Sequence, residues 1–194
     1  MNSGGLALVV GSYLLGSVPF GLLTARFLGG VDPRQGGSGN IGATNVARQA
    51  GKTAGALTLV LDIAKGAVPT LLAGAWLTPA WAALVGLAAF VGHCWPVYLR
   101  FKGGKGVATF LGVLLGMAPW AALTTALLLI LVALVSKHMS LGSMLGGVSS
   151  VVWLWLFNAP VYYLATASLM SLVIIYKHKE NIARLRAGEE HGWR

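Results

Sequence analysis

The chain has 194 residues, of which 56% are hydrophobic and only 10% are charged, and its mean hydropathy is +0.75. A soluble domain of this length needs far more polar surface, so the composition predicts an integral membrane protein. The net charge of +9 then indicates membrane topology, or attraction of anionic lipid or a phosphorylated substrate. Nucleic acid is not an expected partner, because no basic domain lies outside the apolar segments.

Seven apolar segments are predicted to be membrane helices of one all-α domain over residues 1–194. A helix needs roughly 20 residues to cross the apolar core of a bilayer. Turns at Pro79, Pro119 and Pro160 divide three long uncharged stretches into pairs of helices. The fourth helix is too short for a full crossing and is expected to be a half-helix or a tilted one. The predicted helices span residues 4–26, 53–76, 80–98, 106–117, 120–136, 141–157 and 160–177.

The distribution of charge predicts how these helices are oriented. With seven crossings, one face receives the loops 26–52 and 99–105, residues 137–138 and the C-terminal segment. These segments hold 13 of the 14 lysines and arginines, all except Lys65. The other face receives the N-terminus and three proline turns, which carry none. The positive-inside rule therefore predicts an outside N-terminus and a cytoplasmic C-terminus.

The first polar cluster is GGSGNIGATNVAR, residues 36–48. Its glycine-rich backbone and the N-terminus of a following helix would bind an oxyanion, and Arg48 could clamp a phosphate with two hydrogen bonds. The alternative is a flexible linker, but a linker does not need two asparagines, a threonine and an arginine. The candidate phosphate ligands are Ser38, Gly39, Asn40, Thr44, Asn45 and Arg48.

The second polar cluster is GHCWPVYLRFKGGKGVAT, residues 92–109. Two lysines flank glycines that let a ligand approach the backbone closely. Anchoring of the lysines at the membrane surface is the alternative. His93 could equally bond to backbone or act directly in a site. The candidate phosphate ligands here are Lys102, Gly103, Gly104 and Lys105.

The third polar cluster is YKHKENIARLR, residues 176–186. His178 and Asn181 are three residues apart and so share one face of a helix. A histidine titrates near neutral pH, so His178 could be an acid or a base. An interfacial histidine at a helix end is an equally consistent interpretation.

One ion pair is expected inside the second helix. Asp62 and Lys65 are three residues apart at a depth where charge is costly, so they should face the protein interior. They either support the fold or border the site. No metal site and no cofactor are expected, because no cluster of carboxylates and histidines is apparent.

These motifs resemble those of the bacterial acyl-phosphate-dependent glycerol-3-phosphate acyltransferases, the PlsY family. The similar segments are GSGNIGATN followed by Arg48, then GHCWPVYLRFKGGKGVAT and HKENIARL, with YLLGSVPFG and LDIAKG in the first two helices. The resemblance implies a seven-helix enzyme of the bacterial inner membrane with a site that faces the cytoplasm. It also implies transfer of an acyl chain from acyl phosphate to the sn-1 hydroxyl of glycerol 3-phosphate. The products would be lysophosphatidic acid and phosphate, in the first step of phospholipid synthesis.

The resemblance also implies roles for particular residues. Positions tied in that family to substrate binding and catalysis are Ser38, Arg48, Lys105, His178 and Asn181. Less certain roles fall to Asn40, Thr44, Asn45, His93 and Lys102. Because both substrates are phosphorylated and one carries a fatty chain, two anion-binding loops and an opening toward lipid are expected.

The residues predict direct transfer without an acyl-enzyme, since no Ser-His-Asp set and no His-x-x-x-x-Asp pattern is present. Positioning and charge stabilisation would supply much of the rate. Either His178 or a substrate phosphate oxygen would take the hydroxyl proton. A transporter for a phosphorylated solute and a lipid-binding scaffold are the competing hypotheses. The sequence leaves open the oligomeric state, the acyl-chain preference and which loop binds which phosphate.

Overall fold

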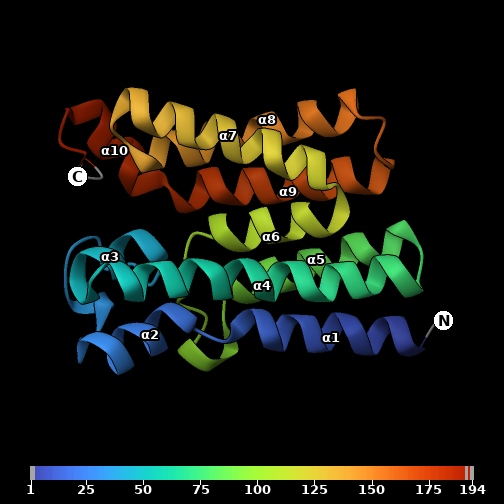
Figure 1. Cartoon of the computed structure of the whole chain (residues 1–194), viewed down its shortest axis with the longest axis horizontal. Coiled ribbons are helices and arrows are strands. Elements are labelled where there is room, and N and C mark those ends of the chain that lie inside the picture. Colours follow the sequence, from blue (N-terminus) through green and yellow to red (C-terminus); the bar gives the residue numbers. More distant parts are fainter. Residues whose placement is uncertain (1–2, 191, 193–194) are drawn as a thin grey trace.

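The computed structural model describes residues 3–190 and 192, and all regular structure in that part of the chain is helical (Figure 1). This confirms the all-α prediction. Two short 3-10 helices, η1 (Pro33–Gln35) and η2 (Val97–Leu99), accompany the α-helices. The α-helices are α1 (Ser3–Ser17), α2 (Phe20–Gly29), α3 (Ala43–Ala50), α4 (Lys52–Trp76), α5 (Pro79–Cys94), α6 (Val107–Met117), α7 (Pro119–Ser136), α8 (Met139–Leu156), α9 (Val161–Lys177) and α10 (Lys179–Ala187).

Apolar helical segments lie over the residues of the predicted membrane helices, with ends that differ by a few residues. Two apolar helices are shorter than a usual crossing, α6 and α9. Large side chains such as Val60, Leu127 and Val135 lie exposed on the long helices, which is typical of a surface that faces lipid. The segments long and apolar enough to cross a bilayer are Ser3–Gly29, Lys52–Trp76, Pro79–Leu99, Pro119–Ser136 and Met139–Leu156.

The long helices lie side by side, with α1 and α2 along one edge and α7, α8 and α9 along the other (Figure 1). Helices α2, α3 and α10 gather toward one end, and α1 begins at the opposite end. We call the first of these the polar end. It is formed by residues 30–51, 95–106, 137–138 and 178–190, which connect or follow the helices there.

Helix α6 packs directly against the middle of α4, because glycines remove the side chains between them. An added Cβ on Gly66 would clash with the carbonyl oxygen of Thr109, and one on Gly112 would clash with that of Ile63. The 11-residue α6 therefore begins about level with the middle of α4 rather than at its end. This short helix leaves room at the polar end for a cavity, and the prediction that the fourth membrane helix is short is confirmed.

The first membrane segment is interrupted, so the prediction of one helix over residues 4–26 is wrong. Helix α1 ends at Ser17 and α2 begins at Phe20. Pro19 explains the break, because proline has no N–H to donate and its ring clashes with the preceding turn. The Val18 carbonyl oxygen at the break accepts from two donors, Lys65 Nζ at 2.9 Å and the Phe20 N–H at 3.0 Å.

The polar segments also contain more helix than the sequence predicted. Residues 36–42 form an irregular loop, but α3 begins at Ala43, so Thr44, Asn45 and Arg48 lie on a helix. The third cluster is not continuous with α9. That helix ends at Lys177, and α10 begins at Lys179 with His178 between them.

Candidate active site

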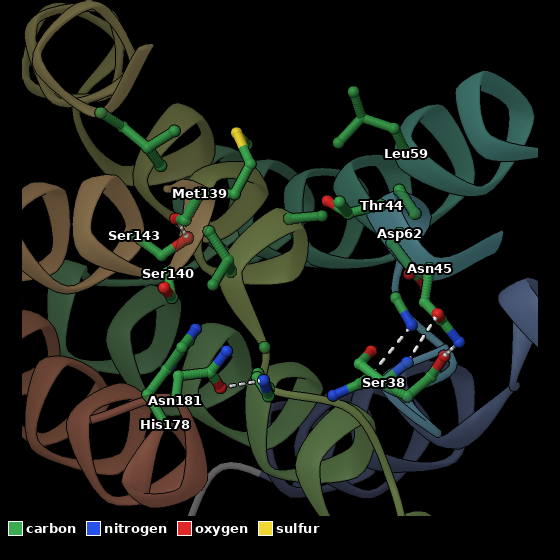
Figure 2. Close-up of a pocket in the computed structure, with 18 of the residues that line it drawn as sticks. Ser38, Thr44, Asn45, Leu59, Asp62, Met139, Ser140, Ser143, His178 and Asn181 are labelled. Atoms are coloured by element: carbon green, nitrogen blue, oxygen red, sulfur yellow. Dashed lines mark hydrogen bonds between the residues drawn. The ribbon is translucent and has the colours of Figure 1, made fainter. Parts of the chain in front are cut away.

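A cavity of about 410 Å³ opens at the polar end and brings the three polar clusters together. Figure 2 shows Ser38, Thr44 and Asn45 on one side of it and Ser140, His178 and Asn181 on the other. The predicted site residues that line this cavity are Ser38, Asn40, Thr44, Asn45, Arg48, Asp62, His93, Lys105, His178 and Asn181.

A second cavity of about 320 Å³ adjoins the first, since both are lined by Ser38, Asn40 and Lys105. Gly39, Gly103 and Gly104 line only this second cavity. Two predicted residues line neither one. Lys102 is exposed on the surface, and Lys65 is buried beneath the site with 3% of its surface exposed.

Asn45 holds the first loop in place. Its Nδ2 donates to the carbonyl oxygens of Pro33 at 2.8 Å and Asn40 at 2.8 Å, and its Oδ1 accepts from the Ser38 backbone N–H at 3.0 Å. Asn45 is buried, so this amide is committed to the loop. An added Cβ on Gly37, whose φ is +59°, would clash with Asn45 Oδ1. The amide thereby fixes Ser38 at the cavity wall.

The first turn of α3 lies at the cavity and has no side-chain cap. Gly42 precedes the helix and supplies no side-chain cap, so the first N–H groups of α3 are left for an anion. Ala43 and Thr44, in this first turn, both line the cavity. Arg48 follows one turn later and lines the same space. This arrangement gives the first cluster the chemistry of a phosphate site.

Lys105 reaches the cavity from a loop that packs flat against His93. The Gly104 N–H donates to the His93 carbonyl oxygen at 3.2 Å, and an added Cβ on Gly104 would clash with His93 Nε2. Gly106 has a φ of +86° and lies against Phe90. Burial and the nearby charge of Arg184 lower the pKa of Lys105, and its Nζ donates to Asn181 Oδ1.

His178 is buried in the break between α9 and α10, with 3% of its surface exposed. Its Nδ1 lies 2.8 Å from the Ile174 carbonyl oxygen. Because a carbonyl oxygen only accepts, Nδ1 carries the proton and Nε2 is free to accept one. Burial and the charge of Lys105 lower the pKa of His178 to about 4. The ring is therefore neutral at physiological pH.

The predicted buried ion pair is present beneath the cavity. Lys65 Nζ lies 2.8 Å from Asp62 Oδ1, and His93 Nδ1 lies 3.6 Å from the same oxygen. All three side chains are at most 4% exposed. Through the bonds described above, this group joins the α1–α2 break to the loop that carries Lys105.

The sequence did not single out several other lining residues. Ser140 and Ser143 come from the first two turns of α8, Arg184 from α10, and Glu190 from the segment that follows it. The sequence signals for them were weak. The two serines are three residues apart, a spacing that fits one face of a helix, and Glu190 lies in a short polar tail. Apolar side chains from α4, α6 and α7 complete the wall, namely Leu59, Ile63, Val107, Leu111, Leu129 and Ile130.

A helical membrane bundle with a cavity that is cationic at one part and apolar at another is typical of proteins that bind a phosphorylated substrate with an apolar portion. The family model described as glycerol-3-phosphate acyltransferase matches residues 6–188. The chain therefore belongs to the glycerol-3-phosphate acyltransferase family, which confirms the resemblance seen in the motifs, and it is an acyltransferase.

Two relatives illustrate how fully the chain matches this family. The glycerol-3-phosphate acyltransferase of Solidesulfovibrio magneticus is 47% identical over 190 residues, which cover 97% of this chain and 94% of the relative. That of Myxococcus xanthus is 50% identical over 181 residues, which cover 92% and 94%.

Two crystal structures show the same fold. PlsY, an integral membrane glycerol 3-phosphate acyltransferase, matches in its glycerol 3-phosphate form with a TM-score of 0.95 and 42% identity, over 98% of this chain and 96% of that one. Its lysophosphatidic acid form matches with a TM-score of 0.91 and 40% identity, over 98% and 95%.

Proposed function

We propose that this protein transfers a fatty acyl group from acyl phosphate to the sn-1 hydroxyl of glycerol 3-phosphate. The products are lysophosphatidic acid and phosphate. One observation carries the proposal: three polar clusters far apart in the sequence converge on a cavity that is cationic at Arg48, Lys105 and Arg184 and apolar at Leu111 and Ile130. Such a cavity fits two phosphate groups and an acyl chain.

The two phosphate groups bind on opposite walls. One wall has the first turn of α3 with Ser38, Thr44 and Arg48, and the other has Lys105 with its flanking glycines. Charge-assisted hydrogen bonds to phosphate are about twice as strong as neutral ones. Lys102 is exposed, so its role is to attract anionic substrates to this surface rather than to hold them.

The reaction proceeds by direct attack. The sn-1 hydroxyl oxygen bonds to the carbonyl carbon of acyl phosphate, and the bond from that carbon to the phosphate oxygen breaks with its electron pair going to phosphate. The hydroxyl proton passes to a phosphate oxygen or to His178 Nε2. A phosphate group has a second pKa near 6, above the pKa of about 4 for His178, so the phosphate oxygen is the stronger base. His178 then serves chiefly as a hydrogen-bond acceptor that orients the hydroxyl.

The polar end faces the cytoplasm of a bacterial inner membrane, and the chain crosses seven times. The seven crossings use the five long segments together with α6 and α9. The lysines and arginines in the described residues lie at or near the polar end, apart from Lys65. The positive-inside rule then places the N-terminus outside, and the site opens to the compartment where phosphorylated substrates are made.

The test is acyl transfer by the protein purified in detergent. Palmitoyl phosphate and glycerol 3-phosphate are supplied together, and phosphate and lysophosphatidic acid are both measured. The proposal predicts equal amounts of the two products and little of either from Lys105→Ala. A transporter or a lipid-binding scaffold would form neither product, and that result in folded protein would overturn the proposal.

A further inference from the structure

The segment after α10 folds back into the site. Helix α10 ends at Ala187, and Gly188 follows it with a φ of +72° and donates its N–H to the carbonyl oxygens of Arg184 and Leu185. The Glu189 N–H also donates to the Arg184 carbonyl oxygen, at 2.8 Å. This reversal of the chain, common where glycine ends a helix, directs Glu190 toward the cavity, where it is a lining residue.

The Glu190 carboxylate is held there by donors from two helices. Its Oε1 accepts from Ser140 Oγ at 2.8 Å and from Asn181 Nδ2 at 2.5 Å, and its Oε2 accepts from Arg184 Nε at 2.8 Å. Only 6% of the Glu190 side chain is exposed. Hydrogen bonds from Asn181, Ser140 and Arg184 outweigh burial and lower its pKa, so the group is an anion at neutral pH.

The same segment also accepts a hydrogen bond from a cationic side chain on the opposite wall. Arg48 Nη2 donates to the Gly192 carbonyl oxygen at 2.8 Å. Asn181, which donates to Glu190, accepts from Lys105 in turn. Donors that suit a phosphate are therefore bonded to this segment, from both sides of the cavity. A buried carboxylate among a serine, an asparagine and an arginine has the same partners that a phosphate would take.

We propose that Glu190 is an internal anion that occupies part of the phosphate-binding site, so a phosphorylated substrate must displace it before binding fully. The inference rests on the proposed function for the identity of the substrate, but not for the occupancy of the site. Glu190 lies two residues beyond the segment 6–188 that matches the family model.

The cost of displacement follows from simple competition. The apparent dissociation constant of a ligand equals the dissociation constant of the open site divided by the fraction of molecules whose site is open. If the carboxylate fills the site about 90% of the time, the apparent affinity for phosphate is roughly tenfold weaker than for an open site. Removal of the carboxylate charge should recover that factor.

Glu190→Gln tests this occupancy, with Glu189→Gln as the matched control. Both variants lose one negative charge from neighbouring positions, but Glu189 is exposed and does not line the cavity. Inorganic phosphate is titrated into each purified protein in detergent, and the rise in thermal midpoint reports binding. We expect Glu190→Gln to bind phosphate several-fold to tenfold more tightly than the parent, and Glu189→Gln to match the parent.

A second measurement distinguishes competition between Glu190 and phosphate from a role in which Glu190 only positions the hydrogen-bond donors. If Glu190 only positioned Asn181 and Arg184, its removal would weaken phosphate binding and raise the KM for glycerol 3-phosphate. Equal or weaker phosphate binding by Glu190→Gln, relative to Glu189→Gln, overturns the inference. A chain that stops after Gly188 gives an independent check, since it should bind phosphate at least as tightly as Glu190→Gln. Loss of acyl transfer in the parent would refute the proposed function instead, while the phosphate titration still decides this inference.

Discussion

Replacement of Lys65 by methionine should destabilise the fold strongly. Lys65 Nζ is buried and makes two polar contacts, one to Asp62 Oδ1 at 2.8 Å and one to the Val18 carbonyl oxygen at 2.9 Å. Methionine fills a similar volume but leaves the carboxylate charged and buried. Removal of one partner from a buried ion pair typically costs about 3–5 kcal/mol of unfolding free energy.

The double variant Asp62→Asn with Lys65→Met shows whether the ion pair is the cause. Removal of both charges is often nearly neutral. The Val18 carbonyl oxygen still accepts from the Phe20 N–H at 3.0 Å, so the remaining cost is the loss of one hydrogen bond, about 0.5–1.5 kcal/mol. Unfolding of the parent, the single variant and the double variant is followed in detergent by circular dichroism. We expect the double variant to be more stable than Lys65→Met alone. If the single variant were as stable as the double variant, the carboxylate would not depend on Lys65 and the reasoning would be wrong.

Three further predictions concern the site. Lys105→Ala should lower kcat/KM about 10- to 100-fold, since a hydrogen bond to a charged group contributes about 1.5–3 kcal/mol, whereas Lys102→Ala should lower it less than about threefold; steady-state rates compare the two. Gly104→Ala should lower kcat/KM roughly tenfold or more in the same assay, because the added Cβ clashes with His93 and displaces Lys105. An unchanged rate would show that the loop accommodates the added Cβ without displacing Lys105. The pKa of His178 falls from 6.5 to about 4 on folding, so the unfolded chain binds more protons in this range, and stability should drop by about 3 kcal/mol as pH falls from 6.5 to 4. His178→Asn should remove most of that slope in thermal unfolding measured across the pH range, and a slope that persists would contradict the assignment.

The helices were largely predictable, because apolar length and proline position act locally. Pro119 and Pro160 stand at or just before the start of α7 and α9, where a missing N–H costs nothing. Pro19 was missed as a break since its neighbours are apolar on both sides, and hydropathy does not register a change of direction. Pro69 shows the converse, because it lies inside the continuous helix α4. Whether proline breaks a membrane helix depends on the partners around it, which a sequence does not display.

The site was predictable in its residue types but not in their partners. Asn45 was expected to contact phosphate, yet its amide binds the loop that carries Ser38. An amide donates and accepts equally well to backbone or to ligand, so only the fold decides between them. Glu190 was missed for a related reason. A short polar tail has no periodicity, and its position depends on the turn at Gly188 and on donors from α8 and α10.

The most direct test of the account is a single turnover with enzyme in excess over palmitoyl phosphate, in the presence and absence of glycerol 3-phosphate. Direct transfer in one cavity predicts that phosphate appears only when glycerol 3-phosphate is present, with one lysophosphatidic acid formed for each phosphate. Rapid phosphate release without glycerol 3-phosphate, together with a protein-bound acyl group, would show an acyl-enzyme and contradict direct attack.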